Sequence, residues 1–232
     1  MKHLILLLSL LLSGWLCGQV NDRLRALTDT DDATVWRQNL RYLERQPRTA
    51  FDGESRAILQ QLLAGPQEQR FPKLFLLAGF IGDEQTLAGL TPDEGWSKQA
   101  KRYLGLARIR TGNAERRANL LKNVRRIELG DDFVYDVVPL LVYTRQREVF
   151  DYLWELVNTR NQACGTADAE STGRIDCGYR IVEYLAGAIV DFPVAVDDDF
   201  TLLTDDYEAA LAEIRRWYAA NRDTYVIDTN TY

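Results

Sequence analysis

The amino-acid sequence predicts an all-α protein, a right-handed solenoid of about ten helices arranged in antiparallel pairs. Two observations lead to this prediction. Apolar residues recur at the three- and four-residue spacing of a helix in almost every segment, whereas the alternation typical of strands is nearly absent. Glycine, asparagine and proline interrupt these periodic segments at short intervals, which indicates short loops between the helices.

The helical spacing is clearest in three segments: Trp36, Leu40 and Leu43; Trp96, Ala100, Tyr103, Leu104 and Ala107; and Tyr207, Leu211, Ile214, Trp217 and Tyr218. Residues 71–81 are apolar nearly all round, so this helix is expected to be surrounded by others. Pro139 lies in the apolar run 134–143, where it must kink a helix or occupy its first turn because it has no N–H to donate. We expect strand only in a short piece such as residues 225–227.

A secretory signal peptide is predicted at residues 1–18. A short basic start precedes a leucine-rich run over residues 4–16, after which the sequence turns polar. We place the cleavage site after Gly18 and expect residues 19–232 to form one exported helical-repeat domain, either periplasmic or secreted. No later segment is apolar enough to span a membrane. A lipid anchor at Cys17 is the disfavoured alternative, because bulky residues precede this cysteine.

Cys164 and Cys177 are the two cysteines that remain after removal of the signal, so an oxidising compartment favours a disulfide between them. The segment between them is polar and shows no helical pattern, which indicates a surface loop that the bridge restrains. A metal-binding or redox-active pair is the alternative. It would need Cys-x-x-Cys spacing or a histidine, and the mature chain has neither.

Three stretches share an apolar helix, a tight polar turn and a second amphipathic helix: residues 74–83, 103–113 and 137–147. Their turns, at Asp83, Asn113 and Arg147, are separated by 30 and 34 residues. With this rhythm, residues 54–158 resemble HEAT-like repeat proteins, most clearly in Leu77-Ala-Gly-Phe-Ile-Gly-Asp-Glu-Gln-Thr-Leu-Ala-Gly-Leu90 and around Pro139. The resemblance implies a helical solenoid whose final helix, near residues 205–221, caps the array. It brings no catalytic residues.

A tetratricopeptide-like repeat is the second resemblance. Tyr103-Leu-Gly-Leu-Ala107 with Gly112-Asn113 is similar to the first helix and turn of that repeat. Arg108 and Arg117, however, stand where that pattern has an aromatic residue and an alanine.

The residue inventory excludes most common catalytic chemistry. His3, in the predicted signal, is the only histidine, so the mature chain has no histidine base, no serine or cysteine triad and no histidine metal site. We therefore expect no cofactor, no metal site and no enzyme activity. The remaining catalytic option is a carboxylate pair, as in glycoside hydrolysis, or a carboxylate-bound metal. Its candidates are residues 197–199 and 205–206, which are better explained as a solvated loop and acidic charge at a helix start, because they do not fit an Asp-x-Asp-x-Asp-Gly loop with a closing glutamate.

Charge is distributed unevenly along a chain whose formal net charge is −6. Residues 101–126 are strongly basic and residues 191–213 are strongly acidic. Both segments are explained by solvated faces that partly neutralise each other. The more specific hypothesis is a basic surface for an anionic partner such as an acidic protein, a polysaccharide or a lipid headgroup. The overall acidity argues against nucleic acid.

Helix geometry selects four members of the basic segment as the candidate interaction surface: Arg102, Arg116, Lys122 and Arg126. If Ala118, Leu121, Val124 and Ile127 form the inward stripe of a helix, then Arg116, Lys122 and Arg126 are exposed. These observations favour a non-catalytic exported scaffold that binds another protein. The alternative is a carboxylate-based enzyme or a glycan or ligand binder with an all-helical cavity.

Overall fold

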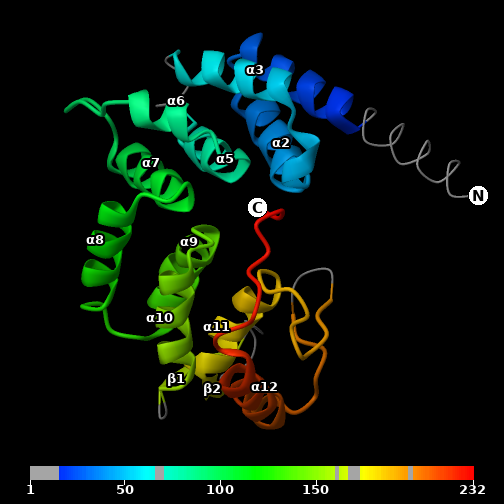
Figure 1. Ribbon diagram of the computed structural model, residues 1–232, viewed down its shortest axis with the longest axis vertical. Coiled ribbons are helices and arrows are strands. Elements are labelled where there is room, and N and C mark those ends of the chain that lie inside the picture. The colour runs from blue at the N-terminus through cyan, green and yellow to red at the C-terminus, as the bar shows by residue number, and fades with distance from the viewer. Residues whose placement is uncertain (1–15, 66–70, 160–161, 167–172, 198–200) are drawn as a thin grey trace, which may run out of the picture. The chain divides into compact units, whose positions relative to one another are not determined.

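The computed structural model describes residues 16–65, 71–159, 162–166, 173–197 and 201–232. Helices account for almost all regular structure in these ranges, so the predicted all-α class is confirmed (Figure 1). No helix in the described part combines the length and apolar character needed to cross a bilayer. The first fifteen residues of the predicted signal peptide lie outside the described residues.

Two compact units divide the chain. Unit 1 comprises residues 1–113 and 229–232, and unit 2 comprises residues 114–228. Each unit packs around its own hydrophobic core. The single repeat domain expected over residues 19–232 stays a prediction, since an array of helix pairs can contain two compact units.

Unit 1 is built around its most apolar helix. Its elements are a helix over residues 16–28, α2 (Ala33–Glu44), the 3-10 helix η1 (Arg48–Ala50), α3 (Gly53–Leu63), α5 (Lys73–Ile81), α6 (Glu84–Gly89) and α7 (Lys98–Arg110). α5 packs against α2, α3, α6 and α7, and every residue from Leu74 to Ile81 is buried. The expectation that this helix is surrounded by others is therefore confirmed.

Gly82 ends α5 in the left-handed conformation, with φ of 78°. A Cβ atom at this position would also collide with the guanidinium group of Arg48. Glycine is therefore favoured here by the backbone angle, whereas the flexible Arg48 side chain could move away from a Cβ atom. The turn that the sequence indicates at Gly82-Asp83 is confirmed, and the Asp83 side chain caps the next helix by accepting a hydrogen bond from the Thr86 N–H at 3.1 Å.

The helix over residues 16–28 contributes one face to the core of unit 1. Val20, Leu24 and Leu27 follow one another at helical spacing and are fully buried. Gln19 accepts a hydrogen bond of 2.7 Å from the hydroxyl group of Tyr42 on α2. All four residues follow Gly18, so cleavage at the predicted site would leave this part of the core in the mature chain.

Unit 2 combines helices with one small hairpin. Its elements are α8 (Ala114–Val124), the π-helix η2 (Phe133–Val137), α9 (Val138–Tyr143), α10 (Arg147–Val157), β1 (Ala163–Gly165), β2 (Arg174–Asp176), α11 (Cys177–Ala186) and α12 (Tyr207–Asn221). Pro139 lies in the first turn of α9, directly after η2. This confirms one of the two placements that its missing N–H allowed.

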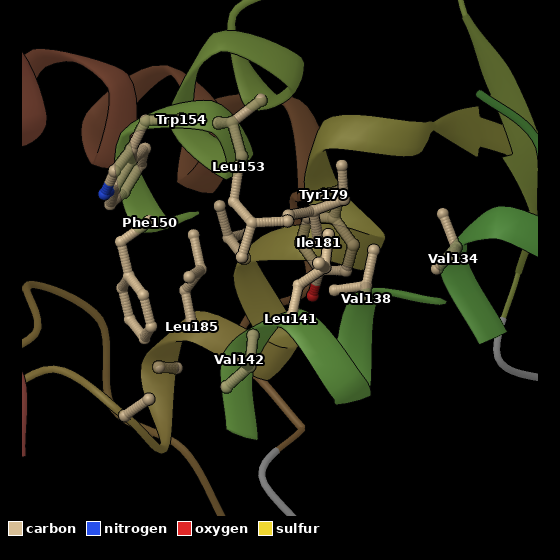
Figure 2. Packing of buried hydrophobic residues seen from close by; sticks show 14 of the residues in the cluster. Val134, Val138, Leu141, Val142, Phe150, Leu153, Trp154, Tyr179, Ile181 and Leu185 are labelled. Carbon is tan, nitrogen blue, oxygen red and sulfur yellow. The ribbon is translucent and has the colours of Figure 1, made fainter. Parts of the chain in front are cut away.

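The core of unit 2 lies where α9, α10 and α11 meet. Figure 2 shows its central side chains: Val138, Leu141 and Val142 from α9, Phe150, Leu153 and Trp154 from α10, and Tyr179, Ile181 and Leu185 from α11. Trp154 is fully buried and stacks on Tyr218 of α12, with ring centroids 4.2 Å apart. Trp36 and Trp96, which belong to the helical apolar patterns of the sequence, are also buried, in the core of unit 1.

The predicted disulfide between Cys164 and Cys177 is present. The ends of the segment that it closes are not a plain surface loop, because β1 and β2 pair as an antiparallel hairpin, with Cys164 opposite Ile175. Both cysteines are fully buried in the core of unit 2, and Cys177 is the first residue of α11. The short strand expected at residues 225–227 is reduced to a single bridge between Ile189 and Ile227.

Replacing Cys164 and Cys177 together by alanine should lower the free energy of unfolding of unit 2 by about 3 kcal/mol, because the bridge no longer restricts the unfolded loop. Denaturant unfolding of the oxidised protein and of the variant measures the difference. The double serine variant should lose more stability, since it places two hydroxyl groups in the apolar core. Equal stability of the oxidised protein and the alanine variant would show that the bridge does not restrain the loop.

Buried tyrosines give unit 2 a predicted sensitivity to alkali. Burial raises the pKa of Tyr179, which is 2% exposed, to about 12. Burial also raises the pKa values of four other tyrosines of unit 2: Tyr152, Tyr184, Tyr218 and Tyr225. Between pH 10 and pH 12 the unfolded chain releases the Tyr179 proton while the folded unit still holds it, so stability falls as pH rises.

We expect Tyr179 alone to account for a loss on the order of 2 kcal/mol by pH 12. Unfolding measured from pH 8 to pH 12, with tyrosinate absorbance recorded in parallel, tests this. The Tyr179→Phe variant should show a shallower decline because it lacks the ionisable group. An identical pH profile in both proteins would show that ionisation of Tyr179 does not cause the loss of stability.

Candidate interaction surface

α8 is the most exposed long helix of unit 2. Val124 is its only buried residue, while Leu120 and Leu121 pack partly against the core. The opposite side is solvent-exposed and carries Arg116 and Lys122. These two residues are six positions apart, or about 120° around the helix axis. They therefore flank one broad exposed arc of α8.

The predicted inward stripe is only partly correct. Val124 is buried and Leu121 is half-buried, but Ala118 is exposed and Ile127 is 50% exposed. Helical spacing fails for Ile127 because α8 ends at Val124 and residues 125–127 form a turn. Arg126 is exposed on this turn.

Two other arginines, one in α8 and one directly after it, connect this segment to α10. The guanidinium group of Arg117 donates a hydrogen bond of 3.0 Å to Gln146 and forms an ion pair of 2.7 Å with Glu148. Arg125 donates to both carboxylate oxygens of Glu155, at 2.8 and 3.2 Å. These hydrogen bonds raise the pKa of Arg125. Arg117 and Arg125 are thus structural residues, whereas Arg116, Lys122 and Arg126 project from the same segment toward solvent.

The basic residues of α7 belong to unit 1 and differ in role. Arg108 donates to the carbonyl of Leu87, at 2.8 and 3.0 Å, and to that of Leu90, so it holds the end of α6. Arg110 lies over the Phe80 ring, 5.0 Å from its centroid. Arg102 is exposed. Of the four candidate residues, Arg102 therefore lies on unit 1, and the other three lie together on unit 2.

The acidic segment does not form a paired-carboxylate site in the described residues. Asp206 caps α12 by accepting the Ala209 N–H at 2.9 Å, and Asp197 accepts the Thr201 N–H at 2.8 Å within a turn. Asp205 is exposed, and residues 198–200 lie outside the described part. No group of three or more potential metal ligands occurs among the described residues.

A pocket between α10 and α12 was not predicted. Its volume is about 590 Å³, and its lining consists of Arg147, Asp151, Trp154, Glu155, Asn158, Tyr218, Arg222 and Asp223. Arg147 donates to the Tyr225 carbonyl at 3.0 Å and to the Arg222 carbonyl, and it lies 3.8 Å from the centroid of the Tyr225 ring. The charged residues spaced by four along α10 were its only sequence signal, and the contribution of α12 depends on tertiary packing.

A buried ion pair was also missed. Arg180 and Glu183 lie on one face of α11, with side chains only 8% and 11% exposed. Arg180 also donates to the Tyr135 hydroxyl at 3.3 Å, and its guanidinium lies 5.5 Å from the centroid of that ring. Burial raises the pKa of Glu183, Arg180 opposes this rise, and Asp197 adds to it.

The arrangement of α8 can bind an anionic surface, and the pocket can hold a small polar molecule. Comparison of the chain with protein-family models, with curated proteins and with solved structures gave no match in any of the three.

Proposed function

We propose that the protein is a non-catalytic, exported scaffold of HEAT-like helix pairs, and that α8 binds an acidic surface of another protein. The observation that carries this proposal is the exposed arc of α8 with Arg116 and Lys122, followed by the exposed Arg126 on the next turn, in a chain that is acidic overall. A local basic surface accelerates encounter with an acidic partner and favours it over basic ones.

The helix arrangement supports the scaffold part of this proposal. The helices are short, and many of them pack against their neighbours in sequence, such as α5 against α6 and α6 against α7 in unit 1. This local packing is typical of helical arrays, whose surfaces serve protein binding. The buried disulfide supports export, because such bridges persist in oxidising compartments.

Reversing the charge of Arg116, Lys122 and Arg126 to glutamate should weaken partner binding on the order of tenfold at low salt and flatten its salt dependence. The partner is first captured from the native envelope and extracellular fractions with the tagged wild-type protein, and its affinity is then measured with purified components. Circular dichroism checks that the variant remains folded.

A matched control reverses three exposed basic residues of unit 1, namely Arg37, Arg41 and Lys98. This variant has the same net charge as the α8 variant, so it should bind the partner nearly as well as the wild type if α8 is the binding surface. Equal weakening in both variants would indicate a general charge effect. Unchanged binding by a folded α8 variant would show that α8 is a solvated surface and does not bind the partner.

The pocket between α10 and α12 favours a second candidate function, binding of a small polar ligand such as a glycan. Its volume lies in the range of small-molecule sites. Trp154 lines it, so titration with mono- and oligosaccharides should change tryptophan fluorescence if a sugar binds. The Asp223→Asn and Tyr218→Ala variants should then lose the response. If none of the saccharides changes the tryptophan fluorescence, the pocket is not a glycan-binding site.

A further inference from the structure

Residues 229–232 pack in unit 1, although the preceding residues belong to unit 2. Two sites just before them are held in unit 2, because the Val190 N–H donates to the Val226 carbonyl and the Asp228 N–H donates to the Ala188 carbonyl, both at 2.9 Å. The last four residues instead contact η1, α5 and α7 of unit 1. They therefore occupy a defined place on unit 1.

Hydrogen bonds from η1 and α7 hold the main chain and one side chain of this segment. The Arg48 N–H donates to the Asn230 carbonyl at 2.9 Å, and the Thr49 N–H donates to Oδ1 of Asn230 at 3.2 Å. The Arg110 guanidinium donates to the Thr231 carbonyl at 2.7 Å. The acceptors include the backbone carbonyls of Asn230 and Thr231, which any polypeptide of the right conformation would present.

An aromatic contact supplies the apolar part of the interaction. The ring of Tyr232 packs edge-on against Phe80, with centroids 5.5 Å apart, and it contacts the core of unit 1. Phe80 is almost fully buried in α5 and also meets Phe51 edge-on. Arg110 lies over the same Phe80 ring while it binds Thr231. One small area thus combines main-chain hydrogen bonding with an aromatic anchor.

This combination is the general mode in which proteins recognise extended peptides: main-chain hydrogen bonds provide affinity, and a side-chain contact provides specificity. We propose that the face of unit 1 formed by Arg48, Thr49, Phe80 and Arg110 is a peptide-recognition site, occupied in cis by residues 229–232. Its partner in trans is an extended segment of another polypeptide that carries an asparagine and, two residues later, an aromatic side chain. None of these residues lies on α8, so the proposal does not depend on the α8 surface.

The cis segment controls access to this site. A tethered segment has an effective concentration in the millimolar range, so a free peptide competes poorly until the tethered copy is weakened. A trans partner therefore needs either additional contacts with the protein or release of residues 229–232. The Tyr232→Ala variant reproduces such release because it removes the aromatic anchor.

The test uses the full chain and a synthetic peptide with the sequence of residues 226–232, with binding followed by NMR. We expect the Tyr232→Ala protein to bind this peptide at least about tenfold more tightly than the wild type does. A peptide with the tyrosine replaced by alanine should not bind. Adding Arg110→Met to the Tyr232→Ala protein should weaken peptide binding several-fold, because the donor to the Thr231 carbonyl is lost.

Amide hydrogen exchange provides a second measurement on the same proteins. The amides of Arg48 and Thr49, which donate to Asn230, should lose protection in Tyr232→Ala and regain it when the peptide is added. If Tyr232→Ala does not fold, Asn230→Ala replaces it, because this substitution removes a polar contact and keeps the aromatic ring. Absence of peptide binding by a folded variant, or equal binding by wild type and variant, would overturn the proposal.

Discussion

Replacing Trp154 by alanine is expected to lower the free energy of unfolding of unit 2 by about 3 to 5 kcal/mol. The side chain is fully buried, so the substitution leaves a cavity where α10 meets Tyr218 of α12. It also removes the stacked contact with Tyr218 at 4.2 Å and the edge-on contact with Tyr225 at 6.4 Å. Each aromatic pair adds to the stability that burial alone provides.

The matched control for this substitution is Trp217→Ala. Trp217 belongs to the same cluster but is only partly buried, so its loss should be clearly smaller. Denaturant unfolding followed by circular dichroism gives both values, and hydrogen exchange assigns the loss to a unit. Amides of α5 in unit 1 should keep their protection. Equal losses for the two variants would contradict the central role of Trp154.

Features with local causes could be predicted from the sequence. The helix at Lys73–Ile81 follows from an uninterrupted apolar run, and its end at Gly82 follows from the need for a positive φ. Pro139 is restricted by its own missing N–H, so its position in the first turn of α9 was one of only two possibilities. In each case, the interactions that determine the local structure involve residues only a few positions apart in the sequence.

Features that depend on distant residues could not be predicted in this way. β1 and β2 are three residues long, too short for an alternating pattern to be recognised, and the disulfide and pairing across the segment hold them together. The docking of residues 229–232 beside η1 joins Thr49 to Asn230, which is 181 positions away in the sequence. No spacing rule relates such positions, because their proximity depends on how the whole of unit 1 packs.

The candidate interaction surface also combines features that local sequence predicts with features that depend on distant residues. Helix geometry correctly exposes Arg116 and Lys122, because the direction of a side chain follows from its place around the axis. It does not reveal that Arg117 and Arg125 pair with Glu148 and Glu155, since these partners lie on α10. A charge pattern in a sequence therefore does not show which basic residues join two helices, because the partners of Arg117 and Arg125 lie about 30 residues further along the chain.

The Glu183→Gln substitution is expected to destabilise unit 2 by about 3 to 5 kcal/mol, because it leaves the Arg180 charge buried without its carboxylate. The Arg180 Nε already lacks a hydrogen-bond partner among the described residues, so the site has little capacity to compensate. Arg180→Met should cost a comparable amount at neutral pH, since it leaves the Glu183 carboxylate buried alone. Unfolding free energies of the single variants measure both effects.

The pH dependence distinguishes these two variants. Burial raises the pKa of Glu183 above its ordinary value, and removal of Arg180 should raise it further. The folded Arg180→Met protein then holds a proton that the unfolded chain has released, so its stability falls as pH rises above the ordinary pKa of glutamate. Glu183→Gln has no proton to release at this site, and its loss should vary little over that range.

The Arg180→Met/Glu183→Leu double variant completes the test. It removes both charges and replaces them with apolar groups, so it should recover most of the stability that either single change costs. A coupling energy of about 2 kcal/mol or more in the double-mutant cycle would then show that the pair acts as a unit. Additive losses would mean that Arg180 and Glu183 contribute separately, with Tyr135 as the more important partner of Arg180.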